Sequence, residues 1–548
     1  MAEEAIVLLN ITDLYYGLDS EKKLAGSGDK AFTRILIVVA SIIYLLAILN
    51  FINLSSCSTN SRHIEIGISK SIGATKKQLR FRFLLESVVI SVAASIMALI
   101  IVQLLLPTFN NEFNINLHYG YSEKLYIILI VVAVSIFSGI VTGIIPAISF
   151  SSIKPLIALK GKFVVLKGRN NIRYPLVIFQ FVASSTLIIC SLFISKQIQY
   201  IKHKDIGFNR ENIITVDLDT KLRQKTTLLK ERVLSNPNIS QVGFSNAIPG
   251  QQINSGPQRF IDNGEEKIIN LSFIDADADF LDLYGFHFIE GSNLPEKPLG
   301  KTSYMVLNES AAKKLAHPMV AKMNENSKIM GIVKDFHFKT LHQSIVPFAF
   351  LCQDMSQMNE FQKSFSAPTK ISIKIDSNDG VVINETIQFI EQTIKDTSPN
   401  SRFNFTFFDN YIDSLYKKEN QIANIITFST FLASFIASIG LLGLSFHTIR
   451  RRTKEIGIRK VNGAKVSEVL KLLIAQFIKW VIIAFTLACP IAYYTMQKWL
   501  EDFAYKTTLS WWIFLLAAIL VMGIALLTVG WHSWRAATRN PVHVLRNE

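Results

Sequence analysis

A ten-residue segment occurs twice in this chain, with the copies about 390 residues apart. The first reads Glu-Ile-Gly-Ile-Ser-Lys-Ser-Ile-Gly-Ala over residues 65–74, and the second reads Glu-Ile-Gly-Ile-Arg-Lys-Val-Asn-Gly-Ala over residues 455–464. Each copy follows one long apolar run and precedes another. A polar, glycine-punctuated segment at the same place in two apolar blocks indicates a duplicated membrane module.

Seven apolar runs are long enough to cross a hydrocarbon core, which takes about 20 helical residues. We place them at 34–56, 84–106, 124–148, 174–196, 422–446, 471–496 and 511–533. The first run is too long, and starts too far into the chain, to be the apolar part of a cleavable signal. The predicted fold class is a multi-span α-helical membrane protein with about seven transmembrane helices.

Lysine and arginine residues are concentrated in every second short loop. The cation-rich loops and tail are 62–82, 154–173, 450–465 and 535–546. Loops 107–123 and 497–510 carry few cations, and such asymmetry marks the rich side as cytoplasmic. It predicts that both repeated segments and the C-terminus are cytoplasmic and that residues 197–421 lie outside. Because loop parity accounts for the net charge of +15, we expect no nucleic-acid partner.

The region 197–421 has the character of a water-exposed α+β domain. Strand patterns occur at Ile213–Leu218 and Ile371–Ile375, and isoleucines recur at helical spacing from Ile383 to Ile394. Asn246–Gly256 and other Gly/Asn-rich stretches are typical of turns. The domains we predict are 1–33, 34–165 (first three-span module), 166–196 (linker and span), 197–421 (outer domain) and 422–548 (second three-span module).

Two polar stretches extend the helices that flank the outer domain. Ser195–Lys204 continues the fourth span, and Asp413–Asn424 leads into the fifth. We expect both to form a stalk that carries motion between the membrane and the outer domain.

The repeated segments have helical patterns. Ile64, Ile68 and Ile72 recur four residues apart, which predicts an amphipathic helix at the cytoplasmic membrane surface. Gly73 and Gly463 are placed to end such helices. A helix that only faces lipid is one interpretation. The repeated acids Glu65 and Glu455 favour a protein partner, because a carboxylate gains nothing from contact with an anionic lipid leaflet.

Several stretches together resemble one family. The run from Arg452 to Ala464 looks like the cytoplasmic coupling segment of the FtsX/MacB-like superfamily of ABC transporter permeases. Residues 540–546 are similar to the C-terminal signature of that family, and Lys154-Pro155-Leu156 echoes it. Residues 331–338, with Leu341-His342, and residues 205–209 resemble the MacB-like periplasmic core domain of double-module permeases of the Bacteroidota type.

The resemblance implies a non-enzymatic permease in a bacterial inner membrane, driven by a separate cytoplasmic ABC ATPase dimer. Motion would pass to the periplasmic domain by mechanotransmission, for efflux or export. A periplasmic adaptor or outer-membrane component is a further candidate partner, beside the lipid bilayer. The candidate ATPase-coupling residues are Glu65, Gly67, Lys70, Gly73, Glu455, Gly457, Arg459, Lys460 and Gly463. Residues 1–33 look like the remnant of a first periplasmic domain, so an N-terminally truncated permease is expected.

Catalytic and metal sites are not indicated. Gly300-Lys301-Thr302 ends like a phosphate-binding loop, but Pro295 stands where the first glycine is required. Asp335 and His337 alternate with apolar residues and read as structural, and the histidines, including His342, lack zinc-ligand spacing. We therefore predict no catalytic residue, no cofactor and no metal site.

Three other functions stay open. An ABC-coupled regulator or sensor of the cell envelope would use the same mechanics without transport. A truncated, inactive permease is the second. A secondary transporter is the third, which the near absence of charged residues in the spans disfavours. Nothing in residues 197–421 selects a substrate.

Overall fold

The computed structural model describes residues 30–57, 63–113, 120–151 and 173–538, apart from residues 252, 299, 355, 357, 360–362, 364 and 365. The chain divides into two compact units. The helical unit comprises residues up to Ser195, Gln421–Lys498 and the residues from Thr508 on. The outer unit comprises Lys196–Asn420 and Trp499–Thr507. A short loop from between two late helices thus belongs to the outer unit.

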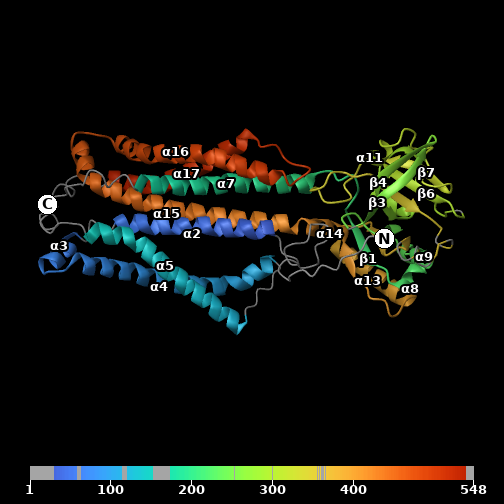
Figure 1. Cartoon of the computed structure of the whole chain (residues 1–548), viewed down its shortest axis with the longest axis horizontal. Coiled ribbons are helices and arrows are strands. Elements are labelled where there is room, and N and C mark those ends of the chain that lie inside the picture. Colours follow the sequence, from blue (N-terminus) through green and yellow to red (C-terminus); the bar gives the residue numbers. More distant parts are fainter. Residues whose placement is uncertain are drawn as a thin grey trace. The chain divides into compact units, whose positions relative to one another are not determined.

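The helical unit is built from long apolar helices and one short polar helix (Figure 1). Their bounds are α2 Lys30–Cys57, α3 His63–Ser71, α4 Lys76–Phe113, α5 Tyr121–Ser151, α7 Arg173–His203, α15 Lys417–Val461, α16 Val466–Leu500 and α17 Trp511–Thr538. Within the described ranges, seven of these helices are long and apolar enough to cross a membrane. The predicted seven spans are confirmed.

Helices α4 and α5 pack at short range because small residues line their contact. A Cβ added at Gly139 would lie 2.6 Å from the Cα of Val88. The Ser91 and Ser138 hydroxyls are 2.7 Å apart and form a hydrogen bond. Small residues that let two helix backbones approach are a common basis of helix association in membranes.

The outer unit contains two sheets. A four-stranded antiparallel sheet has the order β10-β1-β9-β2, and a six-stranded mixed sheet has the order β3-β4-β8-β6-β7-β5. The strands are β1 Ile213–Asp217, β2 Ile239–Ser245, β3 Asn254–Asp262, β4 Glu265–Asp275, β5 Phe288–Gly291, β6 Ser303–Asn308, β7 Ser327–Val333, β8 Phe348–Cys352, β9 Lys370–Ile375 and β10 Phe405–Phe407. This is the predicted α+β architecture.

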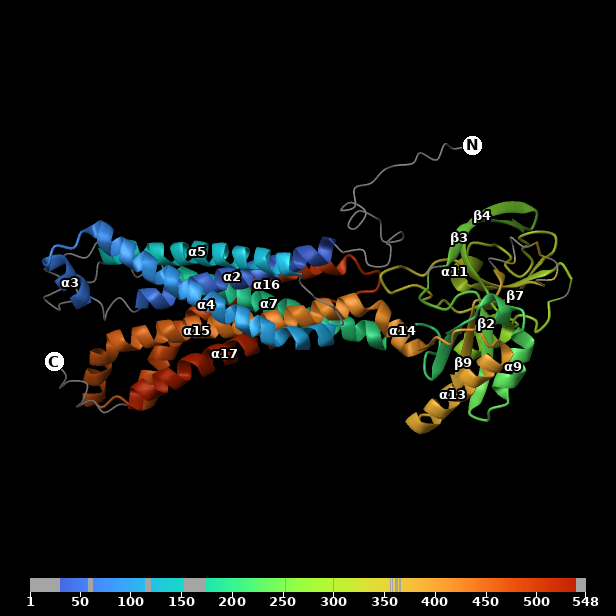
Figure 2. The same cartoon turned by 90° about the horizontal axis from the view of Figure 1, so that it is seen from below.

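Short helices complete the outer unit. They are α8 Thr220–Arg223, α9 Thr226–Leu234, α10 Ala278–Tyr284, α11 Glu309–Ala312, α13 Gly380–Thr397 and α14 Phe408–Leu415. Helices α9 and α13 lie beside β2 and β9 (Figure 2), and their buried isoleucines and leucines form one core with the small sheet. A second core, rich in phenylalanine, surrounds α10. There the fully buried Tyr284 shares a hydrogen bond with Ser372 of β9, 3.1 Å away.

Three expectations change in detail. The stretch predicted as a turn from Asn246 is shorter, because β3 already begins at Asn254. The helical lead into the fifth span breaks at Tyr416, which has φ −104° and ψ 16°, and restarts at Lys417. Finally, α15 runs unbroken through the second repeated segment to Val461. The second copy is therefore the end of a spanning helix rather than a separate surface helix.

Candidate coupling site

Both repeated segments end in the same glycine turn. Gly73 has φ +102° and Gly463 has φ +87°. In each copy the glycine N–H donates to the carbonyl three residues back, at 3.1 Å, and the following alanine N–H donates to the carbonyl five residues back, at 3.0 Å. These two hydrogen bonds, together with a glycine in the left-handed conformation, form a Schellman motif at the C-terminal end of the helix. The predicted glycine ends are therefore present in both copies.

The next helix starts with a side-chain cap in both copies. At the start of α4, the Thr75 hydroxyl accepts from the Gln78 N–H at 3.3 Å, and Gln78 Oε1 accepts from the Thr75 N–H at 2.9 Å. At the start of α16, Glu468 Oε2 accepts from the Lys465 N–H at 3.3 Å. The first is a complete capping box and the second is half of one. Each segment is thus a helix, a tight turn and a second helix.

Both segments bury an isoleucine that lies outside the stripe predicted for the membrane surface. Ile66 is 1% exposed and Ile456 is 6% exposed, and the glycines that follow them, Gly67 and Gly457, are also buried. Ile66 packs on the start of α4 and the end of α5 through Leu79, Phe83 and Ala147. Ile456 packs on Val469 and Leu473 of α16, which stand at the repeat positions of Leu79 and Phe83.

The stripe predicted from helical spacing faces outward. Ile68 is 46% exposed and Ile72 is 81% exposed. Ile458, at the repeat position of Ile68, is 48% exposed. The side chain of Ile64 lies outside the described part of the chain. Each segment therefore buries one isoleucine and presents another, which leaves an apolar surface for lipid or protein.

The repeated acids form ion pairs within the chain. Glu65 lies 2.7 Å from Arg82 of α4, and Glu455 lies 2.9 Å from Arg459 one turn along the same helix. The side chains in both pairs are about half exposed, so each pair contributes at most about 1 kcal/mol. These ion pairs give each acid a partner within the chain, so the acids by themselves do not require a partner protein.

Lys70 holds the end of a neighbouring helix. Its Nζ donates to the Ser151 carbonyl at the end of α5, at 2.8 Å, and Arg80 Nε donates to the Ser151 hydroxyl at 3.0 Å. Cations at a helix C-terminus satisfy carbonyls that have no partner in the helix. Burial, and then the charge of Lys76, lower the pKa of Lys70. In the second copy Lys460 is partly buried, and Arg459 is engaged with Glu455.

Helices α7 and α15 are joined along their length by hydrogen bonds. The sequence patterns did not reveal this ladder. Its rungs are Ser191 with Thr427 at 3.1 Å, Thr430 to the Leu187 carbonyl at 3.1 Å, Ser184 with Ser434 at 3.2 Å and Gln180 to the Ile436 carbonyl at 3.1 Å. Hydroxyl and amide groups in apolar surroundings gain from such pairing.

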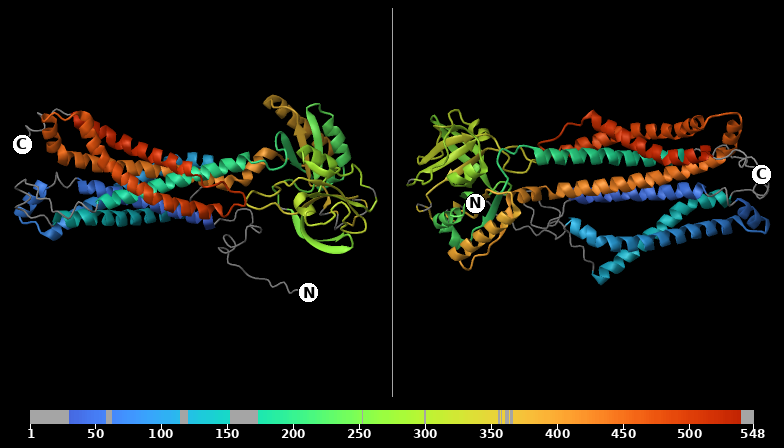
Figure 3. Two further views of the ribbon diagram at one scale, coloured as in Figure 1. Left: turned by 90° about the horizontal axis from the view of Figure 1, so that it is seen from above. Right: turned by 180° about the vertical axis from the view of Figure 1, so that it is seen from behind.

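Gly440 makes the close approach of a third helix possible. A Cβ at this position would lie 2.6 Å from Oε1 of Gln180 on α7 and 3.1 Å from Oδ1 of Asn50 on α2. Asn50 stands at the repeat position of Gly440, so α2 and α15 meet at equivalent points. Figure 3 draws the three helices side by side. The sequence does show polar residues such as Asn50 and Gln180 within apolar runs, which is a sign of helix–helix contact. It does not show which helix each of them contacts.

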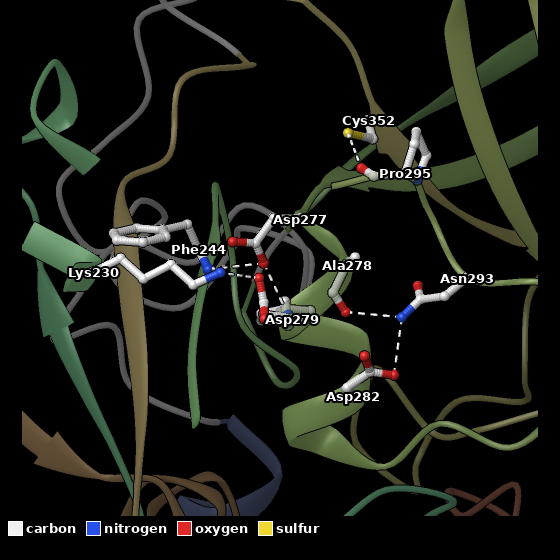
Figure 4. A network of polar contacts seen from close by, with 10 residues as sticks. Lys230, Phe244, Asp277, Ala278, Asp279, Asp282, Asn293, Pro295 and Cys352 are labelled. Carbon is white, nitrogen blue, oxygen red and sulfur yellow. Dashed lines mark hydrogen bonds and ion pairs between the residues drawn. The ribbon is translucent and has the colours of Figure 1, made fainter. Parts of the chain in front are cut away.

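The titratable residues of the outer unit have structural contacts. Asp335 accepts from the Ser310 N–H at 2.8 Å and from the Ser310 hydroxyl at 2.7 Å. Asp277 caps α10 by accepting from the Phe280 N–H at 2.8 Å, and Lys230 pairs with Asp279 beside it (Figure 4). Burial raises the pKa of Asp277 to about 7. Within the described ranges, no group of three or more His, Cys, Asp or Glu residues could hold a metal ion.

Comparison with known proteins gives a family match to the helical segments. Residues 37–155 and 407–541 match the model described as FtsX-like permease C-terminal. Two curated relatives are "Macrolide export ATP-binding/permease protein MacB" from two strains of Campylobacter jejuni, each 27% identical over 165 residues. The match covers 29% of this chain, and the chain spans about a quarter of the length of those relatives, 25%.

Three solved structures of single domains or regions also align with the chain. The periplasmic region of MacB from Actinobacillus actinomycetemcomitans is 13% identical, with a TM-score of 0.27 over 39% of this chain and 97% of that one. The extracellular domain of YknZ, an ABC-type transporter from Gram-positive bacteria, is 10% identical, with a TM-score of 0.23 over 36% and 98%. A domain of a permease protein from Porphyromonas gingivalis is 14% identical, with a TM-score of 0.24 over 37% and 93%.

Proposed function

We propose that this chain is an FtsX/MacB-like ABC permease that couples a cytoplasmic ABC ATPase to an outer domain, because its residues 37–155 and 407–541 match the FtsX-like permease model. In this proposal the chain hydrolyses no ATP. It sits in a bacterial inner membrane with the repeated segments on the cytoplasmic side and the outer unit in the periplasm. The driven process is efflux or export, and a periplasmic adaptor or outer-membrane component is a further partner.

The observation that carries the proposal is the shared geometry of the two repeated segments. Both bury the isoleucine after the acid, expose the isoleucine two residues later and end in the same Schellman turn. Two equivalent, rigidly ended helices suit a partner that itself has two equivalent subunits, such as an ATPase dimer. The exposed Ile68 and Ile458 would enter apolar pockets on the two ATPase subunits, with the candidate coupling residues around them.

The route outward would follow α7 and α15. Each is one unbroken helix, and their ladder of hydrogen bonds makes them a single pair. A displacement of the cytoplasmic end of α15, which includes the second repeated segment, would therefore be carried by both helices to the residues that flank the outer domain.

Mechanical transmission also fits the interior of the spans. Among the described residues of the spanning helices, the buried polar side chains are all uncharged: Asn50, Asn53, Ser87, Ser135, Thr142, Ser151, Gln180, Ser184, Ser185, Gln197, Ser429, Ser445 and Ser533. A pathway for ions or polar solutes through the bilayer midplane usually contains ionisable groups. Several of these buried polar side chains instead make contacts between helices.

The test is a pair of aspartates at the exposed isoleucines. Ile68→Asp with Ile458→Asp, reconstituted in nanodiscs with the partner ATPase, should reduce permease-stimulated ATP hydrolysis by about tenfold or more, as for loss of an interface anchor. Val381→Asp is the matched control, because Val381 is 66% exposed on α13 of the outer unit. Stimulation that is equal in the double variant and the control would reject the docking assignment.

A further inference from the structure

The loop between α16 and α17 is built into the outer unit. The Ala504 N–H donates to the His342 carbonyl at 3.3 Å, and the Tyr505 N–H donates to the Leu341 carbonyl at 3.4 Å. The fully buried Gln197 amide bonds the same loop twice. Its Nε2 donates to the Tyr505 carbonyl at 2.9 Å, and its Oε1 accepts from the Thr507 N–H at 2.8 Å. The loop is therefore attached to both the end of α7 and the segment after β7.

His342 lies where three parts of the outer unit meet. Its Nε2 is 2.9 Å from Oε1 of Glu419 in the first turn of α15, and its Nδ1 is 3.3 Å from the carbonyl of Asp502 in the loop. Its ring stacks on Phe503 at a centroid distance of 4.3 Å. The Leu341 N–H beside it donates to the Tyr416 hydroxyl at 3.0 Å.

Both ring nitrogens of His342 face hydrogen-bond acceptors. A neutral imidazole has one N–H and can satisfy only one of them, whereas the imidazolium donates from both nitrogens. The electrostatics agree with this geometry. Burial alone would lower the pKa of His342, but the hydrogen bond and charge of Glu419, with a smaller effect of Asp502, raise it above the usual value.

The neighbouring charged groups support a localised cation. His337 packs edge-on against Tyr505 at 4.4 Å, and burial, together with the charge of Lys204, lowers its pKa to about 4, so it is neutral at ordinary pH. The Lys204 Nζ lies over the Tyr505 ring, 3.5 Å from its centroid. Glu419 Oε2 is buried and has no hydrogen-bond partner among the described residues. Loss of the cation would leave this carboxylate poorly compensated.

We propose that His342 is a positioning residue whose protonated ring clamps residues 499–507 and the start of α15 to the rest of the outer unit. The clamped loop joins α16 to α17 along the chain, as α7 and α15 join the outer unit to the helical unit. Its use in transmission rests on the function proposed above, whereas the clamp itself does not.

The sign of the pH effect follows from the raised pKa. Contacts that need the imidazolium are complete at acidic pH and are lost as the pH rises through the pKa of His342 in the folded protein. One of the two donated hydrogen bonds then disappears, and the attraction to Glu419 goes with it. The loop should loosen in the alkaline range while the rest of the outer unit stays folded.

Hydrogen exchange of the full chain in nanodiscs tests the clamp. Amides in the peptide that contains Ala504 and Tyr505 should exchange faster in wild type as the pH rises from about 5 to about 9, after correction for intrinsic rates. His342→Gln should exchange about tenfold or more faster than wild type at acidic pH, and without that pH dependence. Glu419→Gln should show the same loss of pH dependence.

Two controls separate the outcomes. His317→Gln changes a histidine whose side chain is 61% exposed and should leave the loop profile unchanged. A loop profile in His342→Gln that equals wild type across the pH range overturns the clamp. Stimulated ATP hydrolysis is measured on the same samples. Its absence with a normal loop profile would count against the proposed function and leave the clamp intact.

Discussion

The glycine that ends the second repeated segment allows a quantitative test of that turn. A Cβ added at Gly463 would meet no atom within 4 Å, so Gly463→Ala causes no collision. Its cost comes only from placing an L residue at φ +87°. That cost is roughly 1–2 kcal/mol, which raises the population of the opened turn roughly 5- to 30-fold.

Hydrogen exchange of the full chain in nanodiscs reads out the opening. The N–H groups of residue 463 and Ala464, which donate to Lys460 and Arg459, should exchange faster in Gly463→Ala by that factor. Gly463→Asn should show a smaller increase, because asparagine tolerates left-handed backbone. Gly73→Ala should match Gly463→Ala at its own turn, since both copies have the same bonds.

Gly380→Ala is the matched control for these variants. A Cβ at Gly380 also meets open space, but its φ is not in the left-handed region. Exchange near Gly380 should stay the same or slow slightly. If Gly463→Ala and Gly380→Ala both leave local exchange unchanged, the conformational argument for the turn is refuted.

Two further sets of variants test packing and charge. Ile66→Ala and Ile456→Ala should each lower the free energy of unfolding of the helical unit by about 2–5 kcal/mol. Ile72→Ala, at an exposed position, should change it by no more than about 0.5 kcal/mol. Thermal unfolding of reconstituted protein compares the variants, and equal effects at Ile66 and Ile72 would contradict the burial of Ile66. Asp277 has a pKa near 7 in the folded outer unit, well above that of an unfolded aspartate, so its stabilising effect is present at acidic pH and is lost as the pH rises through about 7. The outer unit should therefore melt lower at alkaline pH, and Asp277→Asn, which keeps the cap acceptor, should flatten this dependence; an unchanged slope would show that Asp277 is ionised throughout.

Sequence periodicity predicted the elements that can be recognised from their own residues, without knowing what they pack against. The seven spans follow from apolar length, and β1, β9 and α13 follow from alternation or helical spacing. The two glycine turns follow from the position of Gly73 and Gly463 after a helical pattern. In each case the signal lies within a few residues of the element it predicts.

Contacts between distant segments gave no such signal. Ile66 is buried because the end of α5 returns to it, so the choice between Ile66 and the Ile68 stripe depends on tertiary packing. The loop 499–507 has no periodic pattern. Its partners, His342 and Gln197, lie 160 and 308 residues away from their contacts in it. Both histidine and glutamine were visible in the sequence, but only the fold brings them to the loop.

The one charged difference between the repeated segments shows how the two copies have diverged. Ser69 bonds back to the Glu65 carbonyl at 2.8 Å, and the Glu65 carboxylate reaches forward to Arg82 on α4. In the second copy Arg459 replaces that serine and pairs with Glu455 itself, and the residue at the repeat position of Arg82 is Leu472.

The ion pair is thus kept while its cation has moved from one helix to another. In the first copy the pair joins α3 to α4 across the glycine turn, whereas in the second it lies within α15 and does not cross the turn. The two turns therefore share their backbone bonds and a buried isoleucine, but only the first is spanned by this ion pair. The second turn is the one whose helix continues into the ladder with α7.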